Sequence, residues 1–150
     1  MSSGRIQWLL ASTGPLARLG SRIHARVYRA TRGRIGRGWF GAPVMVLETV
    51  GRKSGRPRAT PVLCLRDGER FVVVPANAGK PRPPAWWLNL QAAGEGVAVV
   101  HGVRHRVSPR SAEGQERDRL WAAYVGMYPQ IEDYRAYTDR DLPVVVLEKV

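Results

Sequence analysis

The sequence has few of the residues that build disulfide-linked or metal-bound folds. It contains one cysteine, Cys64, and three histidines among 150 residues. A single cysteine cannot form an internal disulfide, and His24, His101 and His105 form no cluster with it at metal-ligand spacing. We therefore expect a protein of a reducing compartment that binds no metal, with Cys64 in the core.

Long hydrophobic runs are also absent. The longest early apolar stretch, residues 6–11, is interrupted by Gln7. It is too short for a signal-peptide core and far shorter than the roughly 20 residues that span a bilayer. We expect a cytoplasmic protein, and a chain of this length predicts a single hydrophobic core.

Acidic residues are scarce at the N-terminal end. The chain carries 24 Lys and Arg against 12 Asp and Glu, and residues 1–47 contain eight Arg and no acid. This asymmetry indicates an anionic partner, which is nucleic acid, an acidic lipid surface or a phosphorylated small molecule. Charge alone does not choose among them.

Residues 15–31 predict a basic amphipathic helix. Apolar side chains recur there at helical spacing, and arginines form a second stripe on a neighbouring face. The stripes are Leu16, Leu19, Ile23 and Val27, and Arg18, Arg22, Arg26 and Arg29. Three interpretations of this helix stay open. It packs on the rest of the protein, which we argue below is a β-barrel, it contacts a membrane surface, or it clamps a ligand or nucleic acid. We assign residues 1–42 to this helix and a Gly-rich connection, and residues 43–150 to the main domain.

From Pro43 the pattern changes to short β-branched runs separated by turns. Strands are predicted at residues 44–50, 59–65, 71–75, 97–100, 103–107 and 142–147, and helices at 84–93, 111–127 and 129–138. Asp67-Gly68 and His101-Gly102 predict hairpins and hence antiparallel pairing. Because strands and helices do not alternate regularly, we expect a mainly β, α+β fold. It is a partly closed antiparallel barrel of about six strands with helices at its rim.

Two glycine-containing segments resemble nucleotide motifs without fitting them. Residues 36–41 match G-x-G-x-x-G literally, but they follow a helix and precede a strand, the reverse of a dinucleotide fingerprint. Residues 51–55 fit no P-loop frame. Residues 51–58 nevertheless place four cations and a hydroxyl in one turn. That turn is either an anion site or a solvated basic hairpin.

Aromatic residues gather in two places. Trp86 and Trp87 are adjacent, and because successive helical positions are about 100° apart, one is expected in the core and the other beside a ring-shaped ligand. A late group of tyrosines is interpreted as core packing, a substrate wall or proton donors. The group is Tyr124, Tyr128, Tyr134 and Tyr137.

Four segments, in order and at matching spacing, carry a resemblance to a known family. They are "ETVGRKSGRPRATPVLCLRDGERFVVV", "PPAWWLNLQA", "ERDRLWAAYVGMYPQIEDYRAYTDR" and "LPVVVLE", which together span about residues 43–148. They resemble the deazaflavin (F420)-dependent nitroreductase family, a branch of the split β-barrel flavin and deazaflavin oxidoreductases. The resemblance implies an FMN-binding-like split barrel, coenzyme F420 as cofactor, and an F420H2-dependent reductase.

The resemblance also implies roles for individual residues. The residues implied to bind the cofactor phosphate and acidic tail are Arg52, Lys53, Ser54 and Arg58, with Thr60 and Pro61 following on the second strand. Those implied to border the deazaflavin ring are Ala76, Asn77, Trp86, Trp87 and Asn89. The implied chemistry is hydride transfer from C5 of the reduced deazaflavin, with the protein supplying position, shielding and a proton.

On the acceptor side the sequence departs from the nitroreductase pattern. Leu63 and Ile131 stand where that pattern has tyrosines, and Ala76-Asn77 replaces a Ser-Lys pair, whereas Tyr128 and Tyr134 are retained. The two tyrosines are therefore the candidate catalytic residues. The loss of two hydroxyls and one cation predicts a hydrophobic, quinone-like acceptor and leaves nitroreduction open.

Two other classes of function compete with this prediction. The first is a non-enzymatic basic module that binds an anionic membrane or nucleic acid through the arginine-rich residues 18–37. No recognised nucleic-acid motif accompanies that charge, which argues against nucleic acid. The second is the same barrel binding FMN or haem. If the basic helix contacts lipid, the protein is peripheral at the inner face of the plasma membrane.

Overall fold

The computed structural model describes residues 42–150, so the predicted basic helix at residues 15–31 lies outside the described residues. The described strands are β1 (Val44–Val50), β2 (Pro57–Leu63), β3 (Leu65–Asp67), β4 (Arg70–Val73), β5 (Gly96–Val100), β6 (Val103–Ser111) and β7 (Val145–Lys149). The helices of the same region are the 3-10 helix η1 (Asn77–Gly79), α4 (Ala85–Ala93), α5 (Gly114–Met127) and α6 (Ile131–Tyr137). None of these helices is long and apolar enough to cross a membrane.

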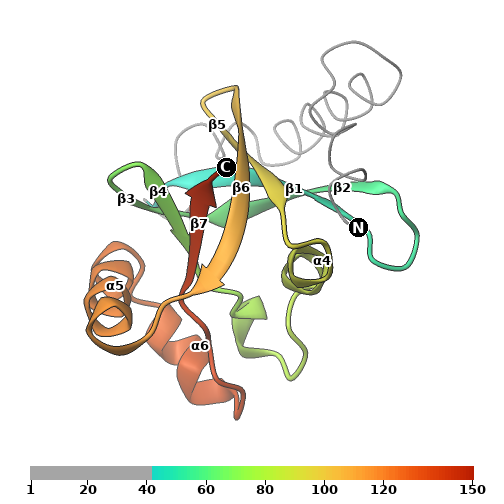
Figure 1. The fold of residues 1–150 in the computed structure, drawn as a ribbon. Helices are drawn as coiled ribbons and strands as arrows, with labels where there is room; N and C mark the ends of the chain where they lie inside the picture. Colours follow the sequence, from blue (N-terminus) through green and yellow to red (C-terminus); the bar gives the residue numbers. More distant parts are fainter. Residues whose placement is uncertain (1–41) are drawn as a thin grey trace.

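The strands form one antiparallel sheet that curls into a half-barrel (Figure 1). Its order is β2-β1-β5-β6-β7-β4-β3, so the two outermost strands are neighbours in the chain. Only Cys64 separates them, and its amide donates to the carbonyl of Pro43 at 2.9 Å. The chain thus passes from one edge of the sheet to the other at Cys64. The predicted antiparallel split barrel is confirmed.

Turn chemistry explains the two hairpins. His101 and Gly102, between β5 and β6, have φ of 50° and 76°, the left-handed conformations of a type I′ hairpin. Gly68, with φ of 60°, follows Asp67 in the turn between β3 and β4. Both turns were predicted from the sequence, and both are confirmed.

The structure differs from the sequence-based expectation at several element boundaries. The run 59–65, predicted as one strand, is divided at Cys64 into β2 and β3, because the chain changes sheet edge there. Ser111 was predicted to cap the following helix, but it ends β6; Glu113 precedes α5 without a side-chain cap. The last strand begins at Val145 rather than at residue 142.

Strands β4 and β7 are buried on both faces, as are β1 and β5, and this burial explains the apolar runs of β4 and β7. Phe71 and Val73 of β4 point into the barrel core, whereas Val72 packs outward against the buried side chains of α5. Strand β7 follows the same rule, with Leu147 inside and Val146 outside. The outer layer contains Leu120 and Tyr124, so α5 is held against the barrel by its own apolar face.

An ion network fastens α5 to the sheet. Glu116 of α5 accepts hydrogen bonds from Arg110 of β6, one of them at 3.0 Å, and forms an ion pair with Arg70 of β4 at 3.3 Å. Arg110 also reaches Glu148 of β7 at 2.7 Å. The network sets the position of the helix that carries Tyr124 and is followed by Tyr128.

We predict that Glu116→Gln lowers stability at neutral pH but not in acid. Hydrogen bonds from Arg110, then its charge and the contact with Arg70, lower the pKa of Glu116 to about 2. A carboxyl whose pKa falls on folding stabilises the native state above its unfolded pKa, and this contribution is lost as pH falls through the folded value. The melting temperature should therefore drop by a few degrees at pH 7, and the difference should vanish toward pH 2.

The matched control is Glu113→Gln, which changes an exposed carboxylate that makes no ion pair with any described residue. It should leave the melting temperature nearly unchanged at both pH values. Equal melting curves for wild type and Glu116→Gln at pH 7 would contradict the stabilising role of the network.

Candidate active site

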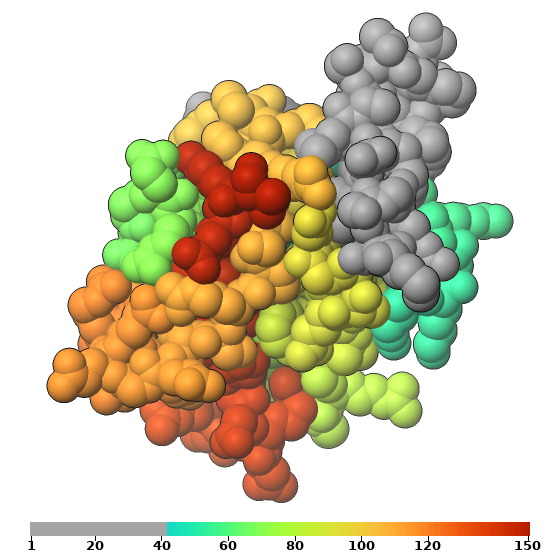
Figure 2. Space-filling model, in the orientation of Figure 1, coloured from blue at the N-terminus to red at the C-terminus, as the bar shows by residue number. Residues whose placement is uncertain are grey.

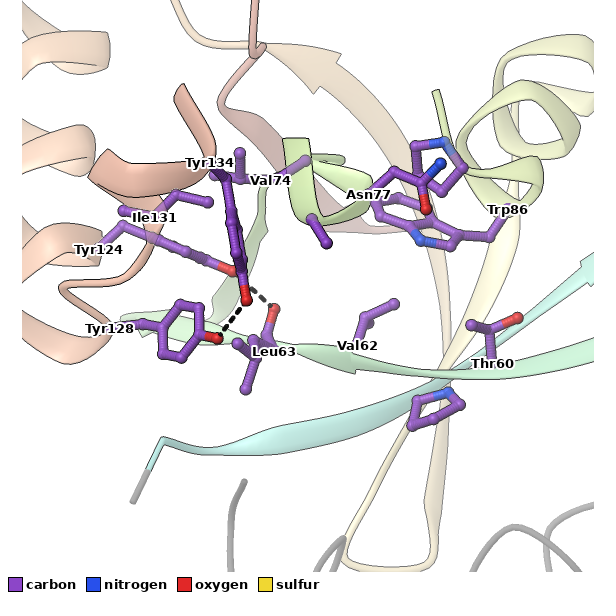
Figure 3. A pocket seen from close by; sticks show the side chains of 14 residues that line it. Thr60, Val62, Leu63, Val74, Asn77, Trp86, Tyr124, Tyr128, Ile131 and Tyr134 are labelled. Carbon is purple, nitrogen blue, oxygen red and sulfur yellow. Dashed lines mark hydrogen bonds between the residues drawn. The ribbon is translucent and has the colours of Figure 1, made fainter. Parts of the chain in front are cut away.

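A pocket of about 310 Å³ lies between β2, the loop after β4, and the ends of α5 and α6 (Figure 3). Its lining residues come from five segments of the chain. They are Thr60, Pro61, Val62, Leu63, Val74, Ala76, Asn77, Ala78, Pro84, Trp86, Tyr124, Tyr128, Ile131 and Tyr134. The walls are mainly apolar and aromatic, with a few hydroxyl and amide groups, which is typical of a site for a ring-shaped ligand.

The open edge of β2 forms one wall of the pocket. Among the described strands β2 pairs only with β1, and backbone groups of successive strand residues point to opposite sides. Because the Cys64 amide points to β1, the backbone groups of Leu63 and Pro61 point to the open side. The Leu63 carbonyl accepts the Tyr124 hydroxyl at 3.3 Å, and Pro61 has no amide hydrogen. Side chains, rather than another strand, therefore cover this edge.

Two tyrosine hydroxyls meet inside the pocket. Those of Tyr128 and Tyr134 are 2.9 Å apart, and their rings are tilted at 53° with centroids 6.1 Å apart. Burial, then the hydrogen bond with Tyr134, raises the pKa of Tyr128 to about 12. Burial likewise raises the pKa of Tyr124. Tyr128 and Tyr124 therefore stay protonated at neutral pH, and the Tyr128–Tyr134 pair can present a hydroxyl proton to a molecule in the pocket.

The loop between β4 and α4 forms the opposite wall (Figure 3). Asn77 and Ala78 have φ of 48° and 53°, and the Asn77 side chain donates to the carbonyl of Arg82 at 2.8 Å. Trp86 and Trp87 both belong to the barrel core and meet edge-on at 66°. Of the two, only Trp86 also lines the pocket.

The basic turn, which we define as residues 51–58, projects at the edge of the molecule where β1 leads into β2 (Figures 1 and 2). The Gly51 amide donates to the Arg56 carbonyl and the Gly55 amide to the Gly51 carbonyl, each at 2.8 Å. A Cβ atom at Gly51 would lie 2.5 Å from the Ser54 hydroxyl, so a side chain there would displace this hydroxyl from its contact with the Arg56 amide. Arg52, Lys53, Arg56 and Arg58 are exposed, and none pairs with a carboxylate among residues 42–150.

Asn89 joins the basic turn to α4. Its side-chain oxygen accepts from the Arg52 amide at 3.1 Å and from the Arg52 guanidinium at 3.3 Å. Its amide group donates to the Thr49 hydroxyl at 3.4 Å, and the residue is 4% exposed. Asn89 therefore lies beneath the turn and fixes it, and it does not line the pocket.

The structure divides the residues singled out from the sequence into two groups. One lines the pocket: Thr60, Pro61, Leu63, Ala76, Asn77, Trp86, Tyr128, Ile131 and Tyr134. The other lies at the basic turn or in the core beside it: Arg52, Lys53, Ser54, Arg58, Trp87 and Asn89. Strand β2 connects them, since the five-residue step from Arg58 to Leu63 spans about 17 Å at the usual rise per residue.

Several residues of the site were missed from the sequence. Val62 and Val74 lie on predicted strands and carried no signal beyond strand alternation. Pro84 and Ala78 flank predicted ring-site residues, so proximity in sequence was the available clue. Arg140, whose guanidinium bonds to carbonyls of the pocket loop, had no sequence signal at all.

The half-barrel, the aromatic pocket and the adjacent basic turn define a class of protein: a split-barrel oxidoreductase that binds an anionic ring cofactor. A sequence profile described as F420H(2)-dependent quinone reductase matches residues 20–149. The chain belongs to this family and is an F420H2-dependent oxidoreductase.

Similar proteins agree with that assignment. An F420H(2)-dependent quinone reductase of Mycobacterium tuberculosis is 35% identical over 132 residues, which cover 85% of this chain and 89% of the relative. A solved F420-H2 dependent reductase (FDR-A) superposes with a TM-score of 0.64 at 29% identity, covering 71% of this chain and 94% of the other. A structure described as a domain-swapped dimer superposes with a TM-score of 0.65 at 25% identity, covering 86% of this chain and 98% of the other.

The residues present fit the F420 cofactor that the family name specifies. The pocket offers flat aromatic and apolar walls for a ring, and the Asn77 and Ala78 amides find no acceptor among the described residues. The cations of the basic turn pair with no carboxylate among residues 42–150, and their charge is complementary to that of a phosphate.

Proposed function

We propose that the protein transfers hydride from reduced F420 to a hydrophobic, quinone-like acceptor held in the tyrosine-lined pocket. The observation that carries the proposal is the continuity of two sites with opposite character. A turn whose cations pair with no carboxylate among the described residues lies at one end of β2, and an apolar aromatic pocket lies along the rest of the strand. This arrangement suits a long ligand with a charged tail and a flat reactive ring.

In this proposal the basic turn binds the phosphate and acidic tail of the cofactor. Arg52, Lys53 and Arg58 supply charge-assisted hydrogen bonds, and the Ser54 hydroxyl adds a donor. Asn89 acts indirectly, because its bonds to Arg52 hold the turn against α4. Thr60 and Pro61 lie along the path from the turn to the ring, with Trp87 supporting Trp86 from the core.

The pocket residues position the ring and exclude water. Trp86 and Ala76 wall the ring, and the amides of Asn77 and Ala78 are donors for its polar edge. The reduced deazaflavin, when bound, supplies a hydride at C5. The chain contributes position and mainly apolar walls, beside which a polar contact is stronger than in bulk water.

The acceptor side is assigned to the residues nearest the tyrosine pair. Leu63 and Ile131 contribute apolar surface, and Ile131 is 2% exposed. A quinone that gains a hydride needs one proton to become a neutral hydroquinone. The Tyr128–Tyr134 pair is placed to donate it, because both hydroxyls lie in the pocket and Tyr128 stays protonated at neutral pH.

The first prediction of this proposal concerns cofactor binding. Lys53→Ala should weaken F420 binding by roughly tenfold at low ionic strength, since a charge-assisted hydrogen bond contributes about 1.5–3 kcal/mol. The loss should shrink in high salt, where exposed charges are screened. Fluorescence titration of oxidised F420 measures both effects.

Arg66→Ala is the control for this titration. It removes the same charge from an exposed position on β3, at the other end of the β2–β3 run. Equal affinities of wild type and Lys53→Ala at low salt would remove the turn from the site. Absorbance spectra of the protein mixed with FMN or haem test the alternative cofactors, and tight binding of either one in preference to F420 would contradict the proposal.

The second prediction concerns the proton donor. Tyr128→Phe or Tyr134→Phe should slow quinone-dependent oxidation of F420H2 by at least roughly tenfold, because general acid catalysis typically contributes about 10²–10⁴ in rate. Quinone should react faster than a nitroimidazole in the wild type. Since the pKa of Tyr128 is raised to about 12, its ionisation should cause no loss of rate between pH 7 and 10.

Tyr137→Phe is the matched control, because this tyrosine is 74% exposed and does not line the pocket. It should turn over quinone at the wild-type rate. If Tyr128→Phe and Tyr134→Phe were both as active as the wild type, the tyrosines would not be the proton donors. A faster reaction with the nitroimidazole than with the quinone would contradict the proposed acceptor.

A third prediction concerns membrane contact, which we propose for residues 15–31. Quinones partition into lipid, and each Arg of the basic stripe would contribute about 1 kcal/mol near an anionic leaflet. The full chain should therefore sediment with anionic vesicles more than with neutral ones. A variant with Arg18, Arg22, Arg26 and Arg29 changed to Gln should lose the difference, and identical recovery of the wild type with both vesicles would refute lipid contact.

A further inference from the structure

The pocket loop after β4 has an unusual backbone. Three successive residues, Asn77, Ala78 and Gly79, have φ of 48°, 53° and 77°. Only glycine adopts this left-handed region without steric cost, and two of the three residues carry side chains. Such a conformation persists where the surrounding structure holds it in place.

One arginine holds this loop at both ends. The Arg140 guanidinium, which follows α6 in the chain, donates to the Ala76 carbonyl at 2.9 Å and to the Lys80 carbonyl at 2.9 and 3.1 Å. A longer contact of 3.5 Å reaches the Pro75 carbonyl. Arg140 pairs with no carboxylate among the described residues, so its planar set of donors is devoted to the loop.

The loop also rests against the helix that carries a catalytic candidate. A Cβ atom at Gly79 would lie 2.9 Å from the Tyr134 carbonyl oxygen and 2.9 Å from the Tyr137 Cβ. The backbones of η1 and α6 therefore approach as closely as glycine permits. A shift of the loop would displace both the Asn77 and Ala78 amides and the neighbouring Tyr134.

We propose that Arg140 is a positioning residue of the active site. It holds residues 76–80 in the left-handed conformation, so that the amides of Asn77 and Ala78 are presented to the polar edge of a ring ligand while Tyr134 keeps its place. This inference rests on the proposed function for the identity of the ligand. The claim that Arg140 holds residues 76–80 in place does not depend on the ligand and is testable without one.

The first test measures hydrogen exchange by NMR in the cofactor-free full chain. The amides of Gly79 and Lys80 donate to the carbonyls of Ala76 and Asn77, each at 3.0 Å, and report the integrity of the loop. Arg140→Gln should accelerate their exchange on the order of tenfold while amides of α5 keep their protection. Arg119→Gln, which removes an exposed guanidinium paired with Asp67, should change neither.

Unchanged exchange at Gly79 and Lys80 in Arg140→Gln would overturn the inference. If this variant fails to fold, Arg140→Lys replaces it, because lysine keeps the charge but cannot donate to several carbonyls in one plane. It should show the same acceleration to a smaller extent, and wild-type exchange in Arg140→Lys would count against the inference.

The second test links the loop to catalysis. Arg140→Gln should lower kcat for quinone reduction on the order of tenfold or more, since small misplacements of a reacting pair are costly. The same substitution should cost less in an Ala78→Gly background, because glycine accepts positive φ without a side-chain penalty. An equal loss in both backgrounds would contradict the positioning role. Failure of the wild type to bind F420 would contradict the proposed function, and the exchange experiment would still decide the role of Arg140 in the loop.

Discussion

The architecture depends on the passage of the chain from one sheet edge to the other at Cys64. Its amide completes the pairing with β1 by donating to Pro43, and the next residue already belongs to β3. Because β2 and β3 are consecutive in the chain, they cannot also pair side by side and close the barrel. The opening that results leaves one edge of β2 without a partner strand among the described residues, and the pocket forms beside residues 60–63. Burial raises the pKa of the Cys64 thiol to about 12, so this residue serves packing and not nucleophilic chemistry.

Local patterns in the sequence predicted most of the fold. Turn residues located both hairpins, and apolar runs located β4 and β7, which are buried on two faces. The break at Cys64 was not predictable, because the run from residue 59 to 65 keeps strand character throughout and only the tertiary pairing divides it. Ser111 is a good helix cap in isolation, but the pairing of β6 with β7 extends to this residue and overrides the local preference.

The sequence likewise predicted the candidate site only in part. The family resemblance indicated both the basic turn and the ring-binding residues, but it could not distinguish side chains that line the pocket from those that support it. Asn89 and Trp87 lie within two residues of each other and near Trp86 in sequence, yet Asn89 faces the turn and Trp87 the barrel core. Arg140 contacts carbonyl groups, which every residue has, so no pattern of residue types could reveal its partners.

The accounting of protons narrows the chemistry that the pocket can support. A hydride ion carries two electrons and one proton, so a quinone that accepts it needs one further proton to become a neutral hydroquinone. Within the described part of the chain no carboxylate or histidine lines the pocket, so the side-chain proton donors there are hydroxyl groups. Tyr124 is committed to the Leu63 carbonyl, whereas Tyr128 and Tyr134 share a hydrogen bond in which either oxygen can be the donor. When Tyr128 donates within the pair, the Tyr134 proton is left for an acceptor oxygen. Tyr134 is only partly buried, so water that reaches its hydroxyl can restore the proton.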